Sequence, residues 1–350
     1  MPNLRLAEIA VSHGQNNAEL GQRLYQQLLH GREEELACHG NGNFVIQRLL
    51  DHIADKEEFV KIGEKLAAIT EDILSHGCTG VVLSLLKTCV RLSSCQTVVM
   101  NKLVESLHCQ DQSDSLAPCL LFMRTKERLS EEAPSVHLHG SLMLQQLLLF
   151  SKPIKLVRSL LSLPASQLSS VLSDPRGCHV TDSFMSSTTV GEKSREGLVK
   201  ALRGELVSLA TSKHGSRTLD TLWRYASIKT KQTLVEELAY KVDHLNSNKF
   251  GKFLVKNWFI SEYKRNKADW TRLVEQEGKI TDSFKEIIGD EKISVKRKLE
   301  SSAENQEVKK KKDVVEVVDM VDQWLKPDVD NKEKPTKKKK TKAKSYLDDL

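Results

Sequence analysis

The sequence predicts an all-α fold, an α-solenoid of stacked helical repeats followed by a disordered basic tail. Three observations predict it: a glycine-containing sequence recurs, its copies are almost evenly spaced, and the apolar residues in each copy follow a helical period. The composition agrees, because 39% of the 350 residues are hydrophobic and only 5% are aromatic, which suits short helices packed through Leu, Val and Ile. A chain of this length can bury a substantial core.

The recurring sequence is clearest as HGNGNFVIQRLL at residues 39–50. It returns as HGSLMLQQLL (139–148), RGCHVTDSFM (176–185), HGSRTLDTLW (214–223) and FGKFLVKNWF (250–259), with a fainter copy, HGCTGVVLSLLK, at 76–87. The small residue that precedes the variable positions is Gly42, Thr79, Gly140, Gly177, Gly215 and Gly251 in turn, at intervals of 37, 61, 37, 38 and 36 residues. Four of the five intervals are close to one value, which is typical of stacked-repeat proteins.

Each copy is expected to form a helix. In the first copy one apolar stripe recurs at helical spacing, and it consists of Val45, Ile46, Leu49, Leu50 and Ile53. Residues 20–29, 59–74 and 206–215 repeat the period. Each repeat should therefore contain two or three short helices, which bury their apolar faces only when neighbouring repeats stack.

The spacing and composition suggest three segments. Residues 1–35 should form N-terminal helices of a partial repeat, and residues 36–289 should form the solenoid of about six degenerate repeats. The interval of 61 residues predicts an insertion near 107–135, a polar loop with a short helix of its own. Residues 290–350 should be a disordered Lys-rich tail, because like charges gather there in blocks at 296–298, 309–312 and 337–340.

The basic blocks in the tail predict nuclear or nucleolar targeting and non-specific contacts with RNA. Between them, VVEVVDMVDQWLK at 314–326 has apolar residues at near-helical spacing. Two interpretations stay open for this stretch: a short helix that binds a partner, or an apolar segment with no fixed structure.

Several classes of protein are excluded. Seven cysteines, an odd number without a C-x-x-C pair, indicate reduced thiols in an intracellular compartment. No stretch reaches the roughly 18 apolar residues of a membrane helix, and no secretory signal is visible at the start. No phosphate-binding loop or nucleophile elbow is found, so we expect no enzyme activity, no catalytic residues, no cofactor and no metal site. The recurring His-Gly pairs at His39, His76, His139 and His214 are interpreted as turn residues.

The polar residues of the repeated helix indicate what it binds. Asn43 and Gln47 are four residues apart, so they share one helix face, with Phe44 beside them and outside the apolar stripe. Stacked repeats would align such faces into a ladder in which amides bond base edges and flat side chains stack on bases. The sequence therefore favours single-stranded RNA as the ligand. The alternative is a HEAT- or armadillo-like nuclear solenoid that binds proteins and makes no base-specific contacts.

GNFVIQRLL resembles the second helix of a pumilio-type RNA-binding repeat. In that family the first and fifth residues of the helix, matched here by Asn43 and Gln47, contact a base edge, and the second, matched by Phe44, stacks between bases. The resemblance implies RNA contacts for five sets of residues: Asn43, Phe44 and Gln47 in the uracil pattern; Ser216, Arg217 and Asp220 in a guanine-like pattern; Ser141 and Gln145, with Leu142 as a poor stacker, in an adenine-like pattern; Cys178, His179 and Asp182 with an unusual edge set; and Lys252, Phe253 and Lys256, where phosphate contact is expected. At Gly80, Val81 and Ser84 the pattern is almost lost.

Four of the five sets also have a structural alternative. Phe44 could be a core residue with surface amides around it, and Arg217 with Asp220 could form a surface ion pair. Cys178 could be a buried thiol beside a capping His179, and Lys252 with Lys256 could be an ordinary basic face.

SDPRGCHVTDSF, SKHGSRTLDTLWRYAS and NSNKFGKFLVKNW resemble the C-terminal half of a nucleolar, ribosome-assembly branch of the pumilio family, over residues 20 to 290. This resemblance implies binding of precursor ribosomal RNA, a part in biogenesis of the small (18S/40S) ribosomal subunit, and pre-ribosomal proteins as further partners. It also implies a nuclear and nucleolar location, and we expect a monomer with no membrane contact. Members of that branch have about twice as many repeats, so the chain is expected to begin in mid-solenoid, as a truncated form would.

Overall fold

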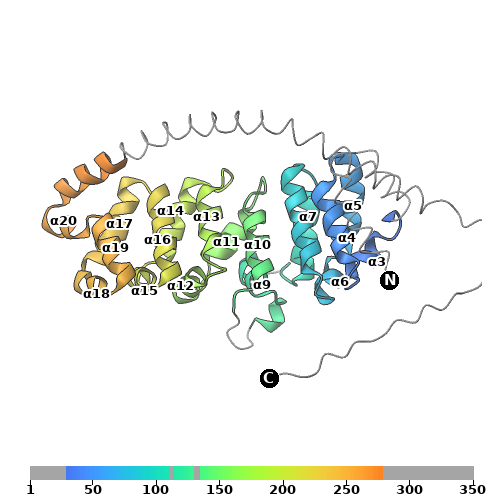
Figure 1. The fold of residues 1–350 in the computed structure, drawn as a ribbon, viewed down its shortest axis with the longest axis horizontal. Coiled ribbons are helices and arrows are strands. Elements are labelled where there is room, and N and C mark those ends of the chain that lie inside the picture. Colours follow the sequence, from blue (N-terminus) through green and yellow to red (C-terminus); the bar gives the residue numbers. More distant parts are fainter. Residues whose placement is uncertain (1–28, 111–112, 130–134, 279–350) are drawn as a thin grey trace, which may run out of the picture. The chain divides into compact units, whose positions relative to one another are not determined.

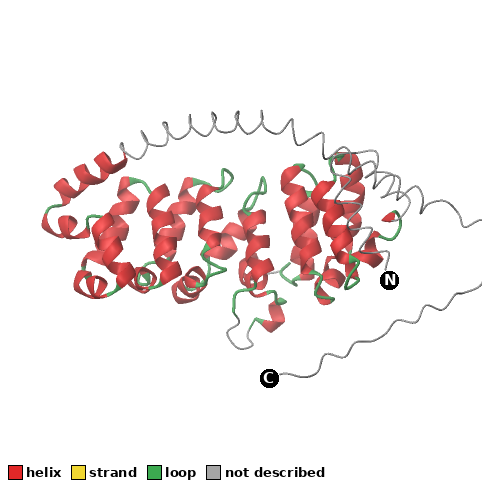
Figure 2. Ribbon diagram, in the orientation of Figure 1, coloured by secondary structure: helices red, strands yellow, loops and turns green. Residues whose placement is uncertain are grey.

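The computed structural model describes residues 29–110, 113–129 and 135–278, which all belong to one compact unit of the chain. Every regular element in this part is helical and none is a strand, as Figure 2 shows, which confirms the all-α prediction. Most of segment 1–35 and all of the tail at 290–350, including the stretch at 314–326, lie outside the described residues. The segment boundaries therefore stay predictions.

The helices fall into three series, with one member of each series in every repeat (Figure 1). The opening helices are α3 (Glu33–Cys38), α6 (Thr70–Ser75), α9 (Leu116–Phe122), α12 (Ala165–Ser173), α15 (Leu206–Thr211) and α18 (Val242–Ser247). The central helices, which carry the recurring sequence, are α4 (Asn43–His52), α7 (Thr79–Arg91), α10 (Leu138–Leu147), α13 (His179–Ser186), α16 (Lys213–Tyr225) and α19 (Lys249–Asn257). The closing helices are α5 (Lys56–Ala68), α8 (Gln96–Ser106), α11 (Ile154–Leu161), α14 (Glu192–Ala201), α17 (Ile228–Ala239) and α20 (Ile260–Arg265).

The central helices pack against one another in chain order, α4 on α7, α7 on α10, and so on to α19 (Figure 1). The apolar stripe predicted for the first copy faces this stack, since Ile46 and Leu50 are completely buried. Hydrogen bonds from threonine hydroxyls also join neighbouring repeats. Thr88 donates to the carbonyl oxygen of Leu50 at 2.8 Å, and Thr218 donates to the carbonyl oxygen of Leu172 at 2.8 Å. This continuous stack confirms the α-solenoid.

At four of the six repeats the recurring glycine is required, because α10, α13, α16 and α19 start directly against the backbone of an opening helix. A Cβ atom placed on these glycines would meet a backbone carbonyl oxygen at a distance that real Cβ atoms do not reach. The distances are 1.9 Å from Gly140 to Leu120, 2.0 Å from Gly177 to Val171, 2.5 Å from Gly215 to Leu209 and 2.6 Å from Gly251 to Leu245. The small residue found in the sequence therefore sets how closely two helices of one repeat approach.

The long interval between α7 and α10 contains α8, then α9 and two short 3₁₀ turns, η3 (Ser113–Ser115) and η4 (Lys126–Arg128). The expected short helix is α9, but it is not part of a polar loop: residues 116–121 are buried, and α9 packs against α10 and α11. It takes the place of an opening helix. The additional residues of the repeat therefore lie on both sides of α9.

The histidines of the His-Gly pairs do not all lie in turns. His39 and His76 do, and the ring Nδ1 of His39 accepts a hydrogen bond from the backbone N–H of Gly42 at 3.0 Å. His139 and His214 instead lie in the first turns of α10 and α16, so the turn prediction is wrong for them. The Nδ1 atom of His139 lies 2.6 Å from the hydroxyl of Thr79, and thus connects two successive central helices.

Tryptophans close the described end of the stack. The rings of Trp223 on α16 and Trp258 after α19 are stacked, with centroids 4.4 Å apart. Trp270, in the helical residues 267–278, is fully buried, meets Trp223 edge-on and donates its Nε1–H to the carbonyl oxygen of Trp258 at 2.9 Å. Three helices are therefore held by one aromatic cluster.

All seven cysteines lie in the described residues as free thiols. Across residues 29–278, as far as the structure describes them, no group of three or more His, Cys, Asp or Glu side chains is arranged to hold a metal ion. None of the helices described has both the length and the apolar character of a membrane span.

Candidate nucleic-acid interface

The residues predicted to contact RNA lie on, or at the start of, five central helices that belong to one continuous stack (Figure 1). The structure thereby places the five sets in one series from α4 to α19. Their side chains differ widely in exposure, however. The second position of each set is the more exposed one, whereas the first position is often buried.

On α4 the Asn43 amide is satisfied within the protein. Asn43 is only 6% exposed, so the prediction that it lies outside the buried stripe is wrong. Its Nδ2 donates to the carbonyl oxygens of His39 and Gly40 at 2.9 and 2.6 Å, and the His39 carbonyl also accepts from the Asn43 backbone N–H at 3.0 Å. Its Oδ1 accepts from the Nε2 of half-buried Gln47 at 2.8 Å. Phe44, by contrast, is 50% exposed, so the core alternative does not hold for this ring.

On α7 the burial agrees with a lost pattern. Val81 and Ser84 are buried, and Gly80 has no side chain to offer.

On α10 the first position is also internal. Ser141 is 1% exposed and donates to the carbonyl oxygen of Arg176 at 2.7 Å, which joins α10 to the turn before α13. Gln145 donates its Nε2–H to the Ser141 hydroxyl at 3.1 Å and is half-buried, as is Leu142. This unit therefore presents one amide and an aliphatic surface.

At α13 the structural alternative holds for the cysteine. Cys178 is 2% exposed, its Sγ lies 3.6 Å from the carbonyl oxygen of Pro175, and burial raises the pKa of its thiol. His179 and Asp182 remain accessible, and the His179 Nδ1 lies 3.4 Å from an Asp182 carboxylate oxygen. The groups of this unit that can contact a ligand are thus one imidazole and one carboxylate.

Asp182 also connects α13 to α16. Its carboxylate pairs with the Arg217 guanidinium at 3.2 Å and accepts from the Thr221 hydroxyl at 2.7 Å. The partner of Arg217 is therefore in the neighbouring repeat, and not Asp220 as the surface-pair alternative supposed. Ser216 donates its hydroxyl to the carbonyl oxygen of Lys213 at 3.0 Å.

A pocket of about 390 Å³ between α13 and α16 is bordered by Asp182, Arg217 and Thr221, and by Asp220. Burial raises the pKa of the Asp220 carboxyl, and the nearby Arg224 partly opposes that rise. Arg224 and Tyr225 line the pocket as well, although the predicted set does not include them. The signal that could have found Arg224 is its position four residues after Asp220, on the same face of a helix that continues to Tyr225.

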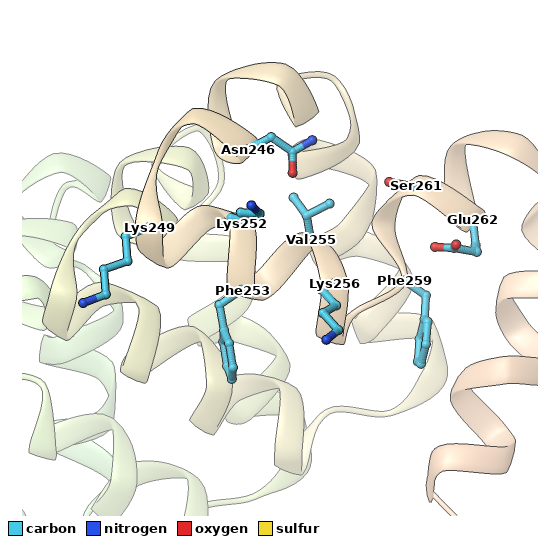
Figure 3. A pocket seen from close by; sticks show the side chains of 9 residues that line it. All are labelled: Asn246, Lys249, Lys252, Phe253, Val255, Lys256, Phe259, Ser261 and Glu262. Carbon is cyan, nitrogen blue, oxygen red and sulfur yellow. The ribbon is translucent and has the colours of Figure 1, made fainter.

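The most basic part of the series is α19, where Lys249, Lys252 and Lys256 line a pocket of about 630 Å³. Figure 3 shows Lys256 between the rings of Phe253 and Phe259. Phe253 is 56% exposed. Ammonium groups next to exposed aromatic faces suit a nucleic-acid strand, because the cations meet phosphates while the rings stack on bases. Lys249 and Phe259 were not predicted, since both lie outside the recurring triplet.

Comparison with known proteins gives relatives with the same architecture. A sequence profile of the NOP9-like PUF repeat domain matches residues 4–253. Nucleolar protein 9 of Mus musculus is 34% identical over 276 residues, which cover 72% of this chain and 43% of that protein. Nucleolar protein 9 of Homo sapiens is 32% identical over 272 residues, with coverage of 71% and 43%. Pumilio homolog 23 of Arabidopsis thaliana is 29% identical, with coverage of 74% and 36%.

Among solved structures, that of APUM23 with GGAGUUGACGG superposes with a TM-score of 0.67 at 25% identity, over 77% of this chain and 52% of that one. The chain spans less than half the length of the curated relatives named above. Two of these relatives are named nucleolar, in agreement with the nuclear and nucleolar location predicted from the basic tail and the resemblance. Since the profile covers well over half of the residues and the repeats form the matching solenoid, the chain belongs to the NOP9-like family of PUF repeat proteins.

Proposed function

We propose that this chain binds single-stranded or partly structured RNA along its central helices, and that its target is precursor ribosomal RNA in the nucleolus. The observation that carries the proposal is the unbroken packing order of α4, α7, α10, α13, α16 and α19. That order lines up the exposed ring of Phe44, the Arg217 pocket and the Lys- and Phe-lined pocket of α19. The proposal assigns binding to the chain and no chemical step.

The geometry favours a binding mode with strong backbone contact and sparse base reading. Lys252 and Lys256 contact phosphates, while Phe44 and Phe253 stack on bases. Base edges are contacted by the accessible polar groups only, Gln47, Gln145, His179, Asp182, Arg217 and Asp220. The first residue of four sets does not contact the RNA itself but supports these groups from within the protein, since each is buried or bonded to the backbone: Asn43, Ser141, Cys178 and Ser216.

The names of the relatives and the nucleotide sequence solved with APUM23 support an RNA partner. We infer from them a part in biogenesis of the small ribosomal subunit, with pre-ribosomal proteins as neighbours and the chain itself as a monomer. In the proposed organisation, residues 36–289 hold the RNA and the Lys blocks of 290–350 add contacts that do not depend on sequence.

The test is fluorescence anisotropy of the full chain with labelled single-stranded RNA over a series of salt concentrations. Lys252→Gln/Lys256→Gln should weaken binding and reduce the slope of log Kd against log salt by about 0.7 for each lost phosphate contact. The matched control is Lys155→Gln/Lys193→Gln, which removes the same charge from exposed positions on the closing helices α11 and α14.

Equal losses in the two double variants would mean that net charge alone attracts RNA, and would contradict a binding surface on the central helices. Replacing the Lys blocks at 309–312 and 337–340 by Gln separates the contribution of the tail. A chain that binds no RNA at all would favour the protein-binding solenoid instead.

A further inference from the structure

Gly80 on α7 lies where the repeat pattern places a base-contacting residue, yet it has no side chain. The space is occupied by Gln47 of the preceding central helix. A Cβ atom on Gly80 would lie 2.6 Å from the Gln47 Nε2, and 2.8 Å from both its Cδ and its Oε1. Because the three amide atoms are almost equally distant, the Gln47 amide lies with its face against the α7 backbone at Gly80.

The orientation of that amide is set by the backbone before α4. Two carbonyl oxygens, those of His39 and Gly40, can only accept hydrogen bonds, so they fix the Asn43 Nδ2 toward them. The Asn43 Oδ1 therefore faces Gln47 and accepts from its Nε2 at 2.8 Å. With Nε2 turned toward Asn43, the Gln47 Oε1 is the amide atom left to accept from a ligand.

An acceptor held in this direction distinguishes the two pyrimidines. Uracil has an N–H at position 3 of its pairing edge, whereas cytosine has an acceptor nitrogen there. A Gln side chain that could turn its amide over would accommodate either base, because it would offer a donor or an acceptor as needed. A fixed amide therefore discriminates between the two bases, because the wrong base leaves a buried polar group without a hydrogen-bond partner.

We propose that Gly80 is a positioning residue for Gln47: its missing side chain lets the amide lie flat against α7 with Oε1 toward the RNA, so that this unit takes uracil in preference to cytosine. The inference rests on the proposed function and deepens it. On this proposal α7 has lost its own base-contacting residue, and the space that is left positions Gln47 of α4.

Gly80→Ala tests this without dismantling the fold. An ordinary contact begins at 3.4 Å, so the methyl group must displace the Gln47 amide by about 0.8 Å. The displaced group is the far end of a flexible side chain and not backbone, so rotation of Gln47 relieves the clash. We therefore expect the variant to fold with a thermal midpoint no lower than that of the unchanged chain.

The assay compares Kd values of the full chain for two labelled RNA decamers, oligouridine and oligocytidine. The unchanged chain should favour oligouridine, and Gly80→Ala should reduce the preference by about three- to tenfold, the effect of one hydrogen bond. Gln47→Ala should cause the same loss, and adding Gly80→Ala to it should change nothing further. Gly63→Ala is the matched control, since its Cβ meets no atom closer than 3.5 Å and should leave the preference intact.

Three results would overturn the inference: an unchanged preference in Gly80→Ala, a Gly80→Ala effect that persists in the Gln47→Ala background, or a Gly80→Ala chain that fails to fold, because each would give Gly80 another role. RNA binding without any uridine preference would also overturn it while leaving the proposed function in place. Absence of RNA binding in every chain, the unchanged one included, would refute the proposed function itself.

Discussion

Replacing Gly140 by Ala should destabilise the solenoid, because the new Cβ atom would lie 1.9 Å from the carbonyl oxygen of Leu120 and 3.0 Å from its carbonyl carbon. The obstacle is backbone of α9, so no side-chain rotation relieves it. Reaching an ordinary contact distance of 3.4 Å requires α9 and α10 to separate locally by about 1.5 Å. Both helices are packed through buried residues, so the shift is resisted on all sides.

Two terms of opposite sign determine the size of the effect. Overpacking of this kind costs about 1–3 kcal/mol, and a contact with fixed backbone places Gly140→Ala toward the upper end. The better helix propensity of Ala returns about 1 kcal/mol. The net free energy of unfolding should thus fall by about 1–2 kcal/mol, which lowers the thermal midpoint by about 2–8 °C for a domain of this size.

The assay is thermal and urea denaturation followed by circular dichroism at 222 nm, with Gly63→Ala as the control. Gly63 lies within α5, and a Cβ there would make only ordinary contacts at 3.5 Å. That variant should gain about 0.5–1 kcal/mol from helix propensity alone. The same chemical change should therefore move the midpoint in opposite directions at the two sites. A Gly140→Ala chain as stable as the original, or a Gly63→Ala chain that loses as much stability, would refute the packing argument.

Three further predictions concern titratable groups. Burial lowers the pKa of both His137 and His139, so the unfolded chain takes up protons first as the pH falls. The stability that these two residues contribute should be full above the unfolded pKa of 6.5 and be lost as the pH falls below it. Melting curves between pH 7.5 and 5.5 should therefore shift less in His137→Asn/His139→Gln. Burial raises the pKa of Asp220 above 3.8, so its charge opposes folding at neutral pH; Asp220→Asn should melt higher at pH 7, and a difference that did not shrink toward pH 4 would contradict this. Burial raises the pKa of the Cys89 thiol to about 12, and the hydrogen bond with Cys109, together with burial, raises the pKa of Cys119. A disulfide reagent at pH 8 should label partly exposed Cys38 and Cys95 before unfolding and Cys89 and Cys119 only after it, as peptide mass mapping would show.

The fold could be predicted because its two determinants are local in the sequence. The recurring glycine and the apolar stripe of each central helix are both visible without any neighbour, and their spacing gives the stack. The identity of α9 was hidden because its short apolar run, Leu116–Phe122, is set between polar segments and shows no full helical period. Its role is defined by the carbonyl of Leu120 against Gly140, a contact that only the structure reveals.

The candidate site was predictable only in part, for the same reason. The exposed positions of Phe44 and Phe253 follow from their place opposite the apolar stripe of their own helices. The first position of each set depends instead on which backbone carbonyls lie nearby, such as that of Arg176 for Ser141. The link between Asp182 and Arg217 likewise joins residues 35 positions apart, and nothing in either helix alone indicates it.

The tryptophan cluster has a consequence for how unfolding of this chain can be observed. Trp223, Trp258 and Trp270 are three of its four tryptophans, and no tryptophan precedes them in the sequence. In a Trp324→Phe chain, intrinsic fluorescence would report only the repeats around α16 and α19, whereas far-ultraviolet dichroism averages over every helix. Repeats that contact only their neighbours can melt in stages. The gap between the fluorescence midpoint and the dichroism midpoint would then measure how far cooperativity extends from that end of the stack, without any attached dye.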